Sequence, residues 1–80
     1  MDKKLSELEP GDTGVVVKIV GSSSTRRRIM DMGVVRGTKV VLIRRAPLGD
    51  PVELEIRDYN LSLRKGEADN IYVETEDSIE

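Results

Sequence analysis

The chain has 80 residues, enough for one small domain, and its 13 basic and 15 acidic side chains give a net charge of −2. It contains no cysteine and no histidine, which excludes disulfides, thiolate catalysis and the usual ligand sets for zinc, copper and ferrous iron. Phenylalanine and tryptophan are also absent, so the core has to be built from aliphatic side chains.

The charge is unevenly distributed along the chain. The last seven residues, ETEDSIE, hold four acidic residues and no basic one, which leaves 13 basic against 11 acidic side chains over residues 1–73. We expect residues 75–80 to form a solvated, disordered acidic tail and residues 1–74 to form the folded domain. A body this close to neutral lacks the strong positive field that non-specific binding to duplex nucleic acid requires.

The N-terminal segment MDKKLSELEPGD has no apolar run of the kind found in signal peptides. No stretch of about 20 apolar residues is present either, so we expect no membrane insertion. Together with the absence of cysteine, these features suit a cytoplasmic location.

A turn precedes the first long predicted strand. Pro10 and Gly11 suit positions i+1 and i+2 of a type II turn, because proline presets φ and glycine accepts a positive φ. The segment TGVVVKIV, 13–20, is rich in β-branched residues and is typical of a strand. Its odd-numbered and even-numbered residues would then cover opposite faces of the sheet.

A short helix is predicted next, with its N-cap at Ser23 or Ser24 within GSSST and its end near residue 32. Gly33 suits the left-handed position that follows a helix, and Val34 would then pack back on the helix. The helix residues expected to face the core are Ile29, Met30 and Met32.

Three consecutive arginines, Arg26, Arg27 and Arg28, lie in this helix. Successive helical residues point about 100° apart, so the three cannot form one flat basic patch. If they lie in the first turn, the helix dipole disfavours them mildly, which indicates a role other than helix stability. Two readings remain open: a docking patch, since arginine is enriched at interfaces, and simple exposure to solvent.

The remaining sequence is dominated by short strands, predicted at 39–45, 52–57, 61–64 and 71–74. A turn is expected at 58–60 and a single helical turn at 65–70. About five strands with one helix inserted after the first long strand favour a mainly β, SH3-like barrel, because curling a small sheet removes its exposed edges. An OB-type barrel is the alternative.

No catalytic motif accompanies these elements. There is no glycine-rich phosphate loop and no nucleophile beside a base, so we expect neither an enzyme nor a bound cofactor. Glu53 and Glu55 could hold a hard cation weakly, but a solvated outer strand face is the better interpretation. Two tyrosines are too few to line a proline-rich peptide groove or to stack single-stranded bases.

The loop APLGDP, between two predicted strands, is expected to be stiff because a proline stands near each end. Leu48 would be an exposed apolar side chain at its tip, which suits an anchor residue, although the prolines could simply shape a turn. The candidate partner-binding residues are Arg26, Arg27, Arg28, Arg45, Leu48 and Asp50. The candidate turn residues are Pro10, Gly11, Gly33, Gly37, Pro47 and Pro51.

Taken together, the motifs resemble the FeoA family, ferrous iron transport protein A, over residues 5–74. The residues that carry the resemblance are Leu8-x-Pro10-Gly11; Arg28-Ile29-Met30-Asp31-Met32-Gly33-Val34 followed by Gly37 and Val40; Ala46-Pro47-Leu48-Gly49-Asp50-Pro51; and Leu61-Ser62-Leu63-Arg64-Lys65 before Ala68 and Ile71. No single motif is diagnostic, but their order and spacing are specific.

The resemblance implies an SH3-like barrel over residues 1–74 and a non-enzymatic, cytoplasmic accessory role. Its implied partner is FeoB, a membrane ferrous-iron transporter with a GTP-binding domain, which the chain would bind and modulate; an arginine that stimulates GTP hydrolysis is a narrower hypothesis. The alternatives are a nucleic-acid-binding barrel and a regulatory, peptide-sensing module like the C-terminal domain of DtxR-type iron-dependent repressors.

Overall fold

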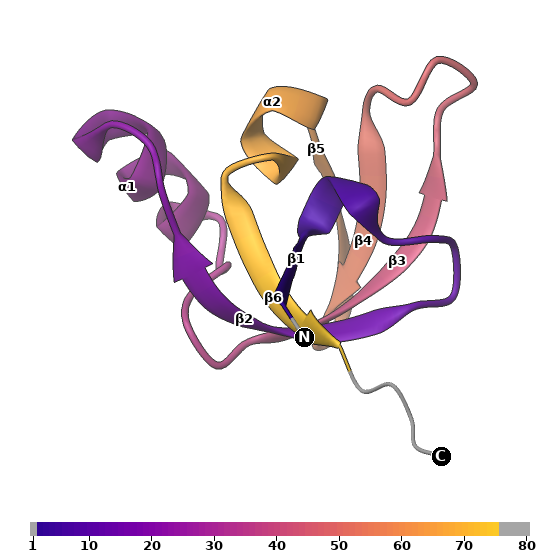
Figure 1. The fold of residues 1–80 in the computed structure, drawn as a ribbon, viewed down its shortest axis with the longest axis horizontal. Helices are drawn as coiled ribbons and strands as arrows, with labels where there is room; N and C mark the ends of the chain where they lie inside the picture. The colour runs from indigo at the N-terminus through magenta and orange to yellow at the C-terminus, as the bar shows by residue number, and fades with distance from the viewer. Residues whose placement is uncertain (1, 76–80) are drawn as a thin grey trace.

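The computed structural model describes residues 2–75, which form a six-stranded antiparallel sheet with the strand order β1-β6-β2-β3-β4-β5 (Figure 1). The strands are β1 (Asp2–Lys4), β2 (Thr13–Ile19), β3 (Lys39–Arg45), β4 (Val52–Ile56), β5 (Tyr59–Leu63) and β6 (Ile71–Thr75). The helical elements are the 3-10 turn η1 (Leu5–Glu7), α1 (Ser23–Asp31) and α2 (Lys65–Ala68). The mainly β class, the helix after the first long strand and the short helical turn near residue 65 are therefore confirmed.

The sixth strand, β1, is the one that the sequence does not predict. Its three residues, DKK, include no β-branched or aromatic side chain that would indicate a strand. Instead β1 is defined by pairing with β6, where Lys3 lies opposite Val73. The strand therefore depends on pairing with residues about 70 positions further along the chain, and no local sequence pattern indicates it.

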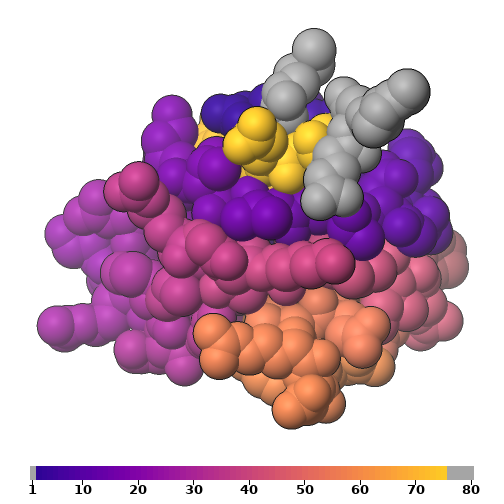
Figure 2. All heavy atoms as spheres, turned by 90° about the horizontal axis from the view of Figure 1, so that it is seen from below, coloured from indigo at the N-terminus to yellow at the C-terminus, as the bar shows by residue number. Residues whose placement is uncertain are grey.

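Two irregularities bend the long strands. The register of β2 against β6 shifts between Val16 and Lys18, and that of β3 against β4 shifts between Leu42 and Arg44. Such bulges increase the twist of a strand, so the sheet curls on itself around its apolar face. Seen from below, β2 and β3 cross the surface side by side, and α1 projects at one end of that face (Figure 2).

The bulge in β2 also overturns the strict alternation predicted for residues 13–20. Val16 is buried before the shift, whereas Ile19 packs against the core after it. An even-numbered and an odd-numbered residue therefore face the same side, because the extra residue of a bulge reverses the order of inward and outward side chains.

The core is wholly aliphatic, as expected. Its buried members are Leu5, Leu8, Val16, Ile29, Val34, Val40, Leu42, Val52, Leu54, Ile56, Leu63, Ala68, Ile71 and Val73. Met32 packs against this cluster, but the prediction for Met30 is wrong, since 44% of it is exposed. The short helix presents only Ile29 as a buried residue, and Met30, about 100° further round, faces away.

Most predicted turns are confirmed. Asp12 N donates to Glu9 O at 2.9 Å across Pro10 and Gly11, and Gly11 has a φ of 93°. After α1, Gly33 has a φ of 99° and Val34 N donates to Ile29 O at 3.3 Å, which is the predicted helix-ending geometry.

Two further turns lie between β3 and β4 and between β4 and β5. Across the loop tip at Pro47, Gly49 N donates to Ala46 O at 2.7 Å. The turn predicted at 58–60 is displaced, because Tyr59 already pairs with Ile56 and leaves a two-residue turn at 57–58. Arg57 takes the left-handed conformation there, with a φ of 53°, although its side chain gives no turn signal.

The predicted acidic tail and the predicted absence of a membrane span can be compared with the described residues. Thr75, which we assigned to the acidic tail, is the last residue of β6 and lies opposite Gly14, so the strand extends one residue further than predicted. The rest of that tail, 76–80, lies outside the described residues. Within 2–75, no helix is both long and apolar enough to span a membrane.

The contact between η1 and α2 predicts a pH dependence of stability. The Ser6 hydroxyl donates to Asp69, and this hydrogen bond, helped by nearby Lys65 and opposed by partial burial, lowers the pKa of Asp69. A carboxyl group whose pKa is lower in the folded state stabilises the fold above its unfolded pKa of about 4, and this contribution is lost as the pH falls through the folded value.

We therefore expect Ser6→Ala to lower the free energy of unfolding near neutral pH and to have a smaller effect at about pH 2–3. Urea unfolding at both pH values measures the difference. Ser62→Ala, at an exposed position of β5, is the control and should change stability equally little at either pH. A Ser6→Ala loss that does not shrink on acidification contradicts the assigned role of Asp69.

Candidate functional site

The start of α1 corrects the prediction for the arginines. Ser22, not Ser23 or Ser24, is the N-cap, and its hydroxyl accepts a hydrogen bond from Thr25 N at 3.2 Å. Arg26 and Arg27 consequently lie beyond the first turn, and Arg28 lies in the last turn, where the helix dipole favours a cation. The dipole penalty inferred from the sequence is wrong and gives no reason to assign these residues a function.

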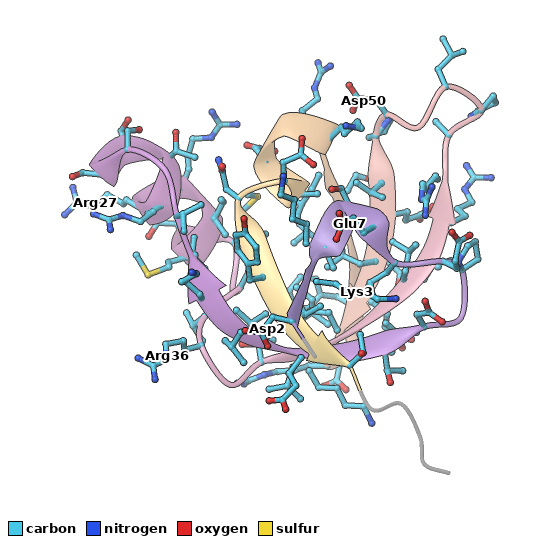
Figure 3. All side chains as sticks on the ribbon, in the orientation of Figure 1. Asp2, Lys3, Glu7, Arg27, Arg36 and Asp50 are labelled. Carbon is cyan, nitrogen blue, oxygen red and sulfur yellow. The ribbon has the colours of Figure 1, made fainter. Side chains whose placement is uncertain are left out.

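Few contacts hold α1 to the sheet. It has nine residues, fewer than the roughly 12–15 that an isolated helix needs in water, and only Ile29 is buried. Its C-terminal end is fastened by Tyr59, whose hydroxyl donates to Met32 O at 2.6 Å. The helix therefore stands at the edge of the molecule, and Figure 3 shows Arg27 pointing away from the sheet.

Arg28 is the arginine that contributes to the fold. Its Nη2 donates to Glu67 Oε2 of α2 at 2.5 Å, with 73% of the arginine side chain and 15% of the glutamate side chain exposed. The other carboxylate oxygen of Glu67 accepts from Arg64 N at 3.1 Å and so caps α2. One half-buried carboxylate thus joins the two helices.

A groove lies along α1 and is also lined by the end of β2 and the segment after α1. It measures about 820 Å³, and its lining residues are Ile19, Ser23, Ser24, Arg26, Arg27, Arg28, Met30, Asp31 and Arg36. We call it the α1 groove. Arg36, from the segment between α1 and β3, lies on the same side of the molecule as Arg27 (Figure 3).

Arg36 and the apolar floor of the groove are what the sequence interpretation missed. Arg36 is separated from the arginine run by the helix end, and Met30 and Ile19 look like ordinary core residues in the sequence. One available signal is the helical periodicity: with Ile29 inward, its neighbour Met30 cannot also face the core fully.

The other three candidate residues lie apart from this groove. Arg45 donates to Leu8 O and approaches Glu9 Oε2 to 3.5 Å, so its half-buried side chain fastens the segment after η1 to β3. Asp50 Oδ1 accepts from Lys65 N at 3.0 Å, at the start of α2. Leu48 is 93% exposed at the loop tip, and its role as an anchor stays a prediction.

The candidate residues therefore occupy two separate places. In Figure 1, α1 lies at the left and the 46–51 loop at the upper right, with α2 between them. Arg26 and Arg27 are available on one side of α2 and Leu48 on the other, whereas Arg28, Arg45 and Asp50 are engaged in internal contacts.

No metal site emerges from the described part of the chain, residues 2–75, which contains no group of three or more carboxylates able to hold an ion. Glu53, one of the two carboxylates considered from the sequence, pairs with Arg44 at 3.1 Å. It thus has the contact expected on a solvated outer face of a sheet.

Comparison with known proteins settles the family, since the model of the FeoA domain matches residues 3–75. The chain belongs to the FeoA family. This FeoA-family chain is 46% identical over 71 residues to the Fe(2+) transport protein A/Fe(2+) transporter FeoB fusion protein of Porphyromonas gingivalis. That match covers 89% of this chain but only 8% of the fusion protein.

Solved structures agree with the fold of this FeoA domain. The FeoA-like protein of Clostridium acetobutylicum is 46% identical, with a TM-score of 0.89 and coverage of 99% of this chain and 92% of that one. The FeoA of Stenotrophomonas maltophilia, solved with zinc and described as a procaryotic SH3 domain protein, is 27% identical, with a TM-score of 0.75 and coverage of 92% and 89%. The SH3-like barrel is therefore confirmed over the OB-type alternative.

The expected likeness to metal-dependent repressors is also found. A manganese-dependent transcriptional repressor matches 92% of this FeoA domain with a TM-score of 0.85, over 41% of the repressor chain. At 20% identity this likeness shows a shared fold and nothing more. Membership of the FeoA family places the chain among small domains involved in ferrous iron transport.

Proposed function

We propose that the chain is a non-enzymatic, cytoplasmic accessory of ferrous iron transport that binds the cytosolic part of a FeoB-like transporter and modulates it. The fusion protein of Porphyromonas gingivalis carries this proposal, because there a domain 46% identical to this chain is joined to a FeoB transporter. Joining two modules in one polypeptide keeps them at an effective concentration of about millimolar.

Specific association with the transporter also needs a binding surface on the FeoA-family domain itself. Arg26 and Arg27 supply exposed cations that have no acidic partner within residues 2–75, and they lie on α1, whose one buried residue is Ile29. The absence of histidine and cysteine removes the commonest general bases and nucleophiles. Binding, rather than catalysis, is the function that this surface supports.

The test is calorimetry of the purified chain with the purified cytosolic part of the FeoB-like transporter encoded by the same genome. We expect saturable binding that Arg26→Glu combined with Arg27→Glu weakens by about tenfold or more, because reversing two interfacial charges costs at least about 1.4 kcal/mol. Arg28 is left unchanged, since its pairing with Glu67 belongs to the fold.

The matched control reverses two exposed cations elsewhere, Lys39→Glu with Arg57→Glu, which line a different hollow. Both double variants change the net charge equally, and thermal unfolding verifies that both are folded. An equal loss of affinity in the two double variants contradicts a specific role for α1. No heat of binding at about millimolar concentration overturns the proposed partner.

A further inference from the structure

The floor of the α1 groove is apolar and open to solvent. Met30 is 44% exposed there, whereas the members of the aliphatic core are almost completely buried. Ile19, which also lines the groove, is partly buried and packs against that core. Methionine is flexible and polarizable, so it adapts to an incoming apolar side chain. An apolar concavity of this kind is typical of a binding site.

The rim of the same groove is cationic. Arg26, Arg27 and Arg36 have no acidic partner among residues 2–75, and Asp31 is the one acidic residue in the lining. The nearby carboxylate of Glu67 is occupied by Arg28 and by the cap of α2. A chain with a net charge of −2 therefore presents a locally positive site.

The size of the groove restricts its occupant. A volume of about 820 Å³ lies in the range of about 300–1,000 Å³ typical of ligand pockets, far above the volume of a single ion. It suits a short piece of polypeptide that brings one apolar side chain to the floor and carboxylates to the rim.

We propose that the α1 groove binds a short acidic segment carrying an apolar anchor residue. The anchor packs against Met30 and Ile19, and flanking carboxylates pair with Arg26, Arg27 and Arg36. This proposal rests on the proposed function for the source of the segment, which is the cytosolic part of the FeoB-like transporter. A nucleic acid would use the arginines but not the apolar floor, and no tyrosine lines the groove for base stacking.

Two designed peptides test the chemistry directly. One carries a leucine flanked by glutamates, and in the other serine replaces that leucine. Fluorescence anisotropy with the full chain should show at least tenfold tighter binding of the leucine peptide, because only that peptide engages both floor and rim. Equal affinity for the two peptides, or tighter binding of a single-stranded oligonucleotide, overturns the proposal.

Two substitutions locate the site. Met30→Glu should weaken binding of the leucine peptide at least tenfold, whereas Val15→Glu, at an exposed apolar position that does not line the groove, should change it less than twofold. Arg36→Glu is a second variant that leaves the helix sequence unchanged, and it should also weaken binding. Unchanged affinity in folded Met30→Glu and Arg36→Glu variants overturns the assignment to this groove.

The same variants separate this inference from the proposed function. If the cytosolic part of the transporter binds the chain and Met30→Glu leaves that affinity unchanged, the groove inference fails and the proposed partner stands. If the leucine peptide binds through Met30 and Arg36 but the transporter does not bind, the proposed partner fails and the groove remains a site for acidic segments.

Discussion

Replacing Gly33 by alanine is expected to lower the free energy of unfolding by about 2–3 kcal/mol. Gly33 has a φ of 99°, a conformation that an L-residue adopts at a cost of about 1–2 kcal/mol. A Cβ at this position would also collide with the hydroxyl oxygen of Tyr59 and disturb its hydrogen bond to Met32 O. A domain of this size has roughly 3–5 kcal/mol of stability, so urea unfolding should show a large shift.

Gly37→Ala is the matched control for this variant. Gly37 also has a positive φ, 88°, but nothing lies within 4 Å of the position its Cβ would take, so only the backbone cost of about 1–2 kcal/mol is expected. Adding Tyr59→Phe to Gly33→Ala removes the colliding oxygen and should cost less than the sum of the single losses. Equal destabilisation by Gly33→Ala and Gly37→Ala contradicts the steric role of Tyr59.

Gly14→Ala is expected to destabilise the domain by about 1–3 kcal/mol through overpacking. The added Cβ would lie 2.9 Å from both Cβ and Cγ2 of Val73, a core residue of the strand β6 that pairs with β2. Alanine normally stabilises a strand or helix relative to glycine by about 0.5–1 kcal/mol, so a loss here has the opposite sign from the usual effect.

Gly66→Ala provides the comparison for Gly14→Ala, because Gly66 lies in α2 with nothing within 4 Å of its hypothetical Cβ. That variant should gain up to about 1 kcal/mol in urea unfolding. Val73→Ala, which removes one of the two colliding carbons, should reduce the cost of Gly14→Ala. If Gly14→Ala keeps the native fold and leaves the free energy of unfolding unchanged, the tight packing of Gly14 against Val73 is contradicted.

The strands that the sequence predicted are those with a local signature. Runs of β-branched residues define β2 and β3, and strict alternation defines β4. β1 has neither, because pairing with β6 alone creates it. The start of α1 was placed one or two residues late, since several adjacent serines are all acceptable N-caps and only the hydrogen bond to Thr25 N distinguishes them.

The candidate site was harder to predict, since its composition depends on contacts far apart in the chain. Arg28 looked equivalent to Arg26 and Arg27, yet its pairing with Glu67, 39 positions away, makes it part of the fold. Arg36 joins the arginines only through the path of the chain after α1. Leu48, at the tip of a proline-bounded loop, could be placed correctly because its exposure follows from local geometry.

The four-residue helix α2 matters for any partner that contacts both α1 and the 46–51 loop, because α2 lies between them. Its Glu67 fixes α1 through Arg28, and its Lys65 backbone fixes the 46–51 loop through Asp50. These two contacts of α2 help to set the distance between the arginines of α1 and Leu48. Any partner that contacts both must match this separation, and a substitution in α2 would change the separation without changing the contact residues themselves.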